Sequence, residues 1–124
     1  MYQSNPLQGL RMLVVEDEAM IAMLVEDMLA ELGCTVVDIA GTVEQGLRLA
    51  EPGKTSIDAA ILDVNIGGEK VFPVADALAA HGVPFVFATG YGSAGIDARY
   101  ENRPVIAKPF RRETLEKSLA SALC

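Results

Sequence analysis

The stretch that decides the fold is MLVVEDE, residues 12–18. Four apolar residues are followed at once by three carboxylates. A short continuous apolar run is typical of a strand that is buried on both faces of a parallel sheet. In such sheets ligands bind outside the carboxyl ends of the strands, where residues 16–18 lie. We therefore expect a buried central strand at 12–15 that delivers acidic side chains to a functional site.

Outward from this stretch, short apolar runs alternate with segments of helical period. The expected strands are 12–15, 35–39, 59–62, 84–88 and 105–107. The expected helices are 18–32, 43–51, 74–80 and 111–123, and residues 65–68 are expected to form a loop. This alternation predicts an α/β fold in which helices cover both faces of a five-stranded parallel sheet.

The first two helices carry local signals at their ends. Gly33 is expected to end the first helix, because glycine readily adopts the left-handed conformation of a C-terminal cap. Thr42 and Gln45 form a capping box at the start of the second helix. In the first helix, the apolar residues recur at steps of three and four and are expected to face the core: Ile21, Leu24, Val25, Met28, Leu29 and Leu32.

The pattern is weakest between residues 89 and 103, where glycines stand at positions 90, 92 and 95. A glycine inside a helix costs about 1 kcal/mol relative to alanine. We therefore expect the fourth helix region to be short or irregular, and we regard this segment as the candidate moving part.

Composition limits the range of functions. The chain has 124 residues, of which 51% are hydrophobic, and a formal net charge of −7. We expect one domain over residues 1–124, with residues 1–10 as an N-terminal extension. The negative charge argues against a nucleic-acid partner. No apolar run approaches the roughly 20 residues of a membrane span, and no signal-peptide layout is visible, so we expect a cytoplasmic protein with no membrane partner.

The cysteines point to no metal site. Cys34 and Cys124 do not have the spacing of zinc ligands, and nothing positions His81, the one histidine, as a base for a cysteine nucleophile. We interpret both cysteines as free thiols in a reducing compartment.

Four of the expected strands end in residues that carry chemistry, and parallel strands bring these ends to one edge of the sheet. Two unit charges about 4 Å apart repel by roughly 4 kcal/mol at an effective dielectric near 20, so clustered carboxylates need a cation. Oxygen ligands that leave room for water and phosphate suit Mg²⁺. A carboxylate beside such a metal can attack phosphorus and become an acyl phosphate. The strand-end residues are Glu16-Asp17-Glu18, Asp63, Thr89 and Lys108-Pro109.

These residues stand in motifs that resemble those of two-component receiver domains, which belong to the CheY-like superfamily. The motifs are LVVED at 13–17, ILD at 61–63, ATG at 88–90 and KPF at 108–110. They occur in order, and the resemblance covers essentially the whole chain. It implies a flavodoxin-like (βα)5 fold and a response regulator that receives a phosphoryl group.

The same resemblance implies a role for each site residue. Asp63 is the implied phosphoacceptor, Lys108 holds a phosphoryl oxygen, and Thr89 is the switch hydroxyl. The implied Mg²⁺ ligands are Asp17, Asp63, the backbone carbonyl of Asn65 and, mainly through metal-bound water, Glu16.

A narrower motif, FATGY at 87–91, is similar to the FATGUY subgroup of receivers. These are typically single-domain proteins of alphaproteobacteria that pair with histidine kinases of the HWE type or related types. Common receivers carry an aromatic switch residue three positions before the lysine, where this chain has Val105. Tyr91 either takes over part of that role or covers the pocket. The implied switch residues are Thr89, Gly90, Tyr91, Lys108 and Pro109, with a cis bond between the last two.

We therefore expect a phosphoacceptor that takes its phosphoryl group from a partner histidine kinase and then alters its contacts with a downstream protein. It would be a monomer, and no enzyme beyond its own phosphorylation and dephosphorylation. A binding module that works without phosphorylation would show a damaged pocket, whereas Asp17, Asp63, Thr89 and Lys108 are all present. A haloacid-dehalogenase-like phosphatase would show Asp-x-Asp after the first strand, where this chain has Asp17-Glu18-Ala19.

Overall fold

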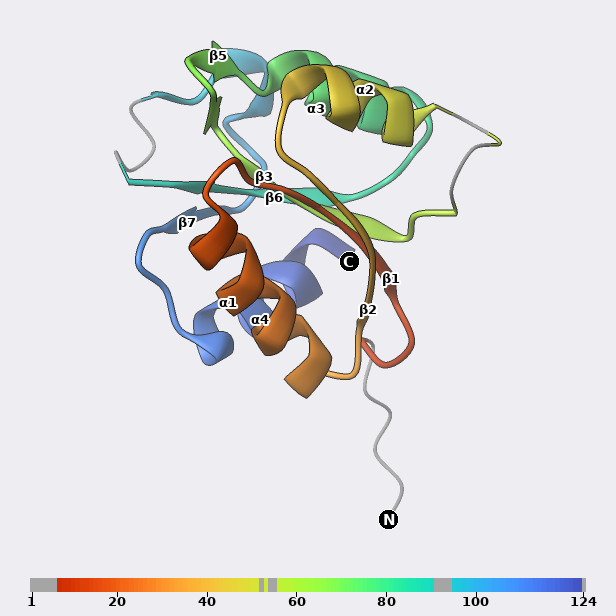
Figure 1. Ribbon diagram of the computed structural model, residues 1–124, viewed down its shortest axis with the longest axis vertical. Helices are drawn as coiled ribbons and strands as arrows, with labels where there is room; N and C mark the ends of the chain where they lie inside the picture. The colour runs from red at the N-terminus through yellow and green to blue at the C-terminus, as the bar shows by residue number, and fades with distance from the viewer. Residues whose placement is uncertain (1–6, 52, 54–55, 91–94, 124) are drawn as a thin grey trace.

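The computed structural model describes residues 7–51, 53, 56–90 and 95–123. The elements in chain order are β1 (Arg11–Val15), α1 (Ala19–Glu31), β2 (Thr35–Ala40), α2 (Val43–Ala50), β3 (Ala59–Asp63), β4 (Asn65–Ile66), β5 (Glu69–Lys70), α3 (Phe72–Ala80), β6 (Phe85–Thr89), the 3-10 helix η2 (Ala98–Tyr100), β7 (Val105–Ala107) and α4 (Arg112–Leu123). The main sheet has five parallel strands in the order β2-β1-β3-β6-β7. Helices α1 and α4 cover one face, and α2 and α3 cover the other (Figure 1). The predicted doubly wound α/β fold is confirmed.

The central strands owe their continuous apolar sequences to burial on both faces. All five residues of β3 and of β6 are buried, and so is β1 from its second residue onward. Leu13 and Val15 pack with α2 and α3, whereas Met12 and Val14 pack with α1 and α4. Because successive side chains of a strand point to opposite faces, one apolar run supplies both cores.

The predicted helix signals are confirmed. Gly33 follows α1 with φ +90°, in the left-handed region. At the start of α2, the backbone N–H of Gln45 donates to Thr42 Oγ1 at 3.0 Å. The Gln45 side chain accepts a hydrogen bond from the backbone N–H of Gly41 at 2.8 Å, one residue before the usual partner in a capping box.

The prediction that Leu24 faces the core is wrong. The buried line of α1 is Ala22, Val25 and Leu29, and Leu24 lies to one side of it with 56% of its surface exposed. Met20 and Met23 are 79% and 61% exposed, so α1 presents an apolar strip outward. Across the part of the chain that the structure describes, no helix has the length and apolar character needed to span a bilayer.

Residues 65–70 form a small antiparallel hairpin rather than a plain loop. Its two turn residues, Gly67 and Gly68, have φ values of +56° and +84°. This pair of positive φ values matches the two-residue turn that suits the twist of hairpin strands, and it strongly favours glycine.

The described residues between β6 and β7 are largely irregular, as predicted. Between residues 96 and 104 the helical structure is the single turn of η2. Its last residue, Tyr100, is only 7% exposed, because its ring packs against Phe72, Phe85 and Phe87 at centroid distances of 5.6 to 6.2 Å.

Part of the expected N-terminal extension is attached to the domain. Leu7 is 1% exposed and packs into the core beneath α1 and α4. The backbone N–H of Gly9 donates to the carbonyl of Gly33, and that of Thr35 donates to the carbonyl of Leu10, both at 2.8 Å. These bonds tie residues 7–10 to the start of β2.

Candidate functional site

The carboxyl ends of four neighbouring strands bring most of the predicted site residues together. Glu16 follows β1, Asp63 ends β3, Thr89 ends β6 and Lys108 follows β7. All four strands run parallel, so these residues meet at one edge of the sheet. Glu16, Asp63 and Thr89 are the buried polar residues of the described chain, with exposed fractions of 5%, 8% and 2%.

Lys108 lies between two carboxylates. Its Nζ donates to Glu16 Oε1 at 2.7 Å and lies 3.0 Å from Asp63 Oδ2. Its backbone N–H donates to the Thr89 carbonyl at 2.9 Å, which ties the ends of β6 and β7 together. The peptide bond between Lys108 and Pro109 is cis, as the family resemblance implied.

One lysine shared by two carboxylates leaves the charges unbalanced. Burial raises the pKa of Glu16, and the nearby Asp63 charge adds to this, although hydrogen bonds from Lys108 and the Glu18 N–H partly offset it. Burial alone would lower the pKa of Lys108, but its bonds to both carboxylates outweigh burial and raise that pKa. The lysine therefore stays charged, while the acids compete for it.

Asp17 is held from the other side of the site. Its Oδ2 accepts a hydrogen bond from the backbone N–H of Gly67 at 2.9 Å, across fifty positions of sequence. The turn of the 65–70 hairpin thereby positions a predicted metal ligand. Asn65, in β4, accepts a hydrogen bond from Lys70 Nζ through its Oδ1 at 2.7 Å.

These residues open onto a cavity of about 420 Å³, which we call the strand-end cavity. Three predicted site residues do not line it: Glu16 and Thr89, which are buried, and Pro109. The lining residues are Asp17, Glu18, Asp63, Asn65, Gly67, Gly68, Gly90 and Lys108.

The carboxylates offer oxygen ligands for a divalent cation. Oxygens of Glu16, Asp17 and Glu18 lie within 4.8 Å of one another. Glu18 was not among the predicted ligands, although its place beside Asp17 in the sequence was a signal. Asp63 is joined to this group through Lys108 rather than as part of it. The predicted switch residue Tyr91 lies outside the described residues.

A second hollow adjoins the cavity. This pocket of about 250 Å³, which we call the α1 pocket, is mainly apolar and shares Lys108 with the strand-end cavity. It is lined by Ile21, Leu24, Val25, Met28, Lys108, Pro109 and Phe110.

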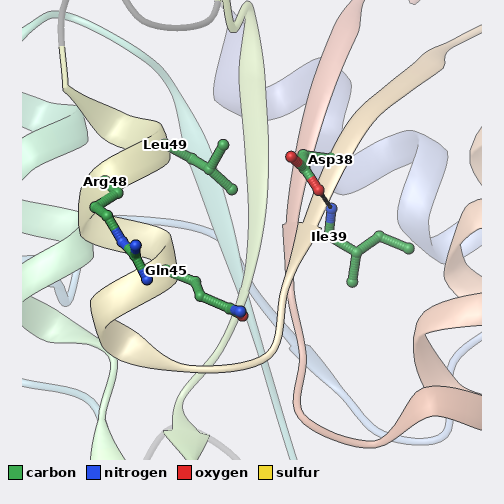
Figure 2. Close-up of a pocket in the computed structure, with 5 residues that line it drawn as sticks. All are labelled: Asp38, Ile39, Gln45, Arg48 and Leu49. Carbon is green, nitrogen blue, oxygen red and sulfur yellow. Dashed lines mark hydrogen bonds between the residues drawn. The ribbon is translucent and has the colours of Figure 1, made fainter.

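A further pocket, between α2 and β2, contains no predicted site residue (Figure 2). Its volume is about 310 Å³, and it is lined by Asp38, Ile39, Gln45, Arg48 and Leu49. The Asp38 carboxylate accepts a bond from the N–H of Ile39, and Arg48 pairs with Glu44 in its own helix. Because Asp38 and Arg48 already have local hydrogen-bond partners, we do not assign chemistry to it.

Residues 12–120 match the response regulator receiver domain family. The chain belongs to that family. This receiver is similar to SdrG from Sphingomonas melonis Fr1, whose solution structure is 50% identical, with a TM-score of 0.82 over 94% of this chain and 98% of that one. The fold and the family are those of the phosphoacceptor module of two-component response regulators.

Two longer regulators are also similar to this receiver. The phyllosphere-induced regulator PhyR of Methylorubrum extorquens is 31% identical over 116 residues, which cover 90% of this chain and 42% of PhyR. The transcriptional regulatory protein PdtaR of Mycobacterium tuberculosis is 32% identical over 104 residues, covering 81% of this chain and 50% of PdtaR. The receiver thus spans about half the length of these relatives or slightly less.

Proposed function

We propose that this receiver accepts a phosphoryl group on Asp63. The observation that carries the proposal is the position of Asp63, which lines the strand-end cavity with its Oδ2 3.0 Å from Lys108 Nζ. The carboxylate is the nucleophile, and a fixed positive charge stands beside it to neutralise the group that arrives.

The transfer requires no further nucleophile. A carboxylate oxygen of Asp63 attacks the phosphorus of a phosphohistidine, the P–N bond breaks, and the imidazole nitrogen leaves with the electron pair and takes up a proton. Lys108 binds a phosphoryl oxygen, and the Thr89 hydroxyl donates to another once the group is in place. The reaction modifies the protein itself, so we do not assign it turnover of a separate substrate.

We propose that Mg²⁺ is held by Asp17 and Asp63, by the backbone carbonyl of Asn65 and, through water, by Glu16. The donor set fits this ion, because hard oxygen ligands of which several are charged suit Mg²⁺. When bound, the metal would supply positive charge that helps to neutralise the transferring phosphoryl group. Gly67 contributes by fixing Asp17 through its N–H.

The proposed switch comprises Thr89, Gly90, Tyr91, Lys108 and Pro109. A phosphoryl group adds about −1.5 to −2 charge, by analogy with other phosphorylated side chains, and it draws Thr89 and Lys108 toward it. Gly90 lines the cavity directly after Thr89, so a movement there passes into the irregular segment before β7. Changed protein–protein contacts of that segment are the proposed output.

The proposed phosphoryl donor is a sensor histidine kinase of the HWE type, in keeping with the FATGY motif. The proposed docking face for this kinase on the receiver is the apolar strip of α1, formed by Met20, Met23 and Leu24, together with the α1 pocket. Lys108 lines both this pocket and the strand-end cavity, so a helix seated on α1 would bring its phosphohistidine to the mouth of the cavity. We place this exchange in the cytoplasm, with the receiver a monomer.

The first test is the intact mass of the protein after incubation with acetyl phosphate and Mg²⁺. We expect the mass to increase by one phosphoryl group, and we expect a chelator or the Asp63→Asn substitution to abolish the increase. If Asp63→Asn gains the same mass, the acceptor is a different residue. If neither protein gains mass, even with a purified histidine kinase as donor, the function is phosphorylation-independent binding.

The docking face has its own test. We expect Met23→Glu to slow transfer from the kinase by about tenfold or more, because it places a charge in an apolar contact. Uptake from acetyl phosphate should not change, since Met23 lines neither hollow. If the kinase transfers its phosphoryl group to the wild type and to Met23→Glu at equal rates, the kinase docks on another face.

A further inference from the structure

The 65–70 hairpin places a second lysine beside the strand-end cavity. Asn65 and Lys70 are directly opposite one another in its two-stranded ladder. Lys70 Nζ donates to Asn65 Oδ1 at 2.7 Å, a distance typical of a charge-assisted hydrogen bond. The turn of the same hairpin donates a hydrogen bond to Asp17 through the Gly67 N–H. The hairpin is therefore held in place beside the cavity.

This bond fixes which end of the Asn65 amide faces the lysine. An ammonium group has three donors and no acceptor, so only the amide oxygen can face it. The NH₂ end is consequently turned away from Lys70. Asn65 lines the cavity together with Asp63. With Oδ1 held by Lys70, the part of its amide that remains for a group bound there is a hydrogen-bond donor and not an acceptor.

We propose that Lys70 is a positioning residue that lengthens the lifetime of the phosphoryl group on Asp63. The inference rests on the proposed function. Loss of the group is hydrolysis: a water oxygen attacks phosphorus, the bond between phosphorus and the carboxylate oxygen breaks, and Asp63 leaves as a carboxylate. The protons of the water go to inorganic phosphate and to solvent.

An attacking water is activated by a hydrogen-bond acceptor, because its oxygen becomes more nucleophilic as it gives up a proton. While Lys70 holds Oδ1, the amide cannot accept from such a water. Without Lys70 the amide is free to rotate about its last torsion and present Oδ1 to the cavity. Lys70 therefore slows hydrolysis through Asn65, without contacting the phosphoryl group.

The test measures the rate at which the protein loses its phosphoryl group. The protein is first phosphorylated with acetyl phosphate and Mg²⁺, and the acetyl phosphate is then removed. We expect Lys70→Met to lose the group about three- to tenfold faster than the wild type, the range of one hydrogen bond. Lys70→Arg should restore the wild-type rate, because guanidinium also only donates. Lys117→Met, the same change at an exposed lysine of α4, should have no effect.

Two further measurements separate positioning from a general effect of charge. In an Asn65→Ala background, Lys70→Met should no longer change the hydrolysis rate, because the amide through which Lys70 acts is gone. In metal-free, unphosphorylated protein, the side-chain NH₂ resonances of Asn65 should shift in Lys70→Met and stay in place in Lys117→Met.

Unchanged or slower hydrolysis in Lys70→Met would overturn the proposal. The proposal would also be overturned if Lys70→Met still accelerates hydrolysis in the Asn65→Ala background. The same holds if the side-chain NH₂ resonances of Asn65 do not shift in Lys70→Met. If the wild-type protein takes up no phosphoryl group from acetyl phosphate or a kinase, the proposed function fails and this inference fails with it. That outcome is distinct, because it appears in the uptake step before any hydrolysis is measured.

Discussion

Two clusters of this receiver each hold carboxylates around one cation, and they differ in how far they are exposed to solvent. In the strand-end cluster, formed by Glu16, Asp63 and Lys108, two buried carboxylates share one lysine. In the cluster that we call the Asp76 link, one carboxylate serves two donors. Asp76 Oδ1 accepts a hydrogen bond from the Tyr100 hydroxyl and lies 3.0 Å from Arg99 Nη1.

The comparison teaches how a functional site differs from a structural connection. The Asp76 link joins α3 to η2, and its Arg99 also pairs with Asp97 at 3.2 Å. These side chains are exposed enough for solvent to screen the extra negative charge, so nothing has to be added to the link. The strand-end cluster has more negative than positive charge in a buried place, which is costly unless a cation is supplied. The excess is what a metal ion and a transferring phosphoryl group can use. The predictions below test this difference.

The largest effect is expected for Lys108→Met. It removes the positive charge beside Asp63, and a lost charge stabiliser of this kind typically slows reaction about 100- to 1,000-fold. The rate of mass gain with acetyl phosphate and Mg²⁺ measures it, with Lys117→Met as the matched control. A loss of less than tenfold would mean that Lys108 is only a structural partner of Glu16.

The two clusters should respond oppositely to loss of a carboxylate charge. Asp76→Asn should lower the free energy of unfolding by about 1 kcal/mol, because it weakens bonds to Arg99 and Tyr100 that are partly exposed to solvent. Asp63→Asn should leave that free energy unchanged or raise it, because Glu16 then has Lys108 to itself. Urea unfolding without metal measures both. A clear destabilisation by Asp63→Asn would contradict the idea of excess charge.

The Asp76 link should also make the stability of the protein depend on pH in the alkaline range. Burial, and then the hydrogen bond to Asp76, raises the pKa of Tyr100 to about 12 from an ordinary value of 10. The folded state therefore holds this proton more tightly than the unfolded chain. The stability it contributes is complete below pH 10 and is lost as the pH rises through 12. Unfolding of the wild type compared with Tyr100→Phe between pH 9 and 12 measures the loss, and parallel curves would rule out the raised pKa.

The smallest effect is expected at acid pH in the strand-end cluster. Because the pKa of Glu16 is raised, its contribution favours folding below the ordinary value of 4.5 and is lost as the pH rises through its native value. Ionised Glu16 therefore costs stability at neutral pH. In metal-free buffer, the stability of the wild type relative to Glu16→Gln should rise as the pH falls from 7 toward 4.5. A relative decrease would mean that Lys108 compensates Glu16 fully.

Much of the fold could be predicted because it follows from local patterns. The five strands lie where their apolar runs stand, and no strand end differs from its predicted position by more than one residue. Leu24 was misplaced because a helix that is apolar on more than one side does not show which side meets the sheet. The 65–70 hairpin was missed because strands of two residues are too short for a pattern, although Gly67-Gly68 is a turn signal.

The candidate site was predictable as a set of residues but not as a network. The order of the motifs placed Glu16, Asp63 and Lys108 at one edge of the sheet. Nothing in the sequence paired Lys70 with Asn65, or Tyr100 with Asp76, because each pair depends on how a connecting segment folds back.

The sequence by itself determined the class of fold, the edge of the sheet that carries the site and the family of the chain. These properties follow from the periods of local runs and from residues that directly follow strands. Only the tertiary structure decided that Lys108 is shared by two carboxylates and that a glycine N–H holds Asp17. Those contacts join residues up to 92 positions apart. Their distances are set by the packing of the whole sheet and its connections, which no local stretch of sequence encodes.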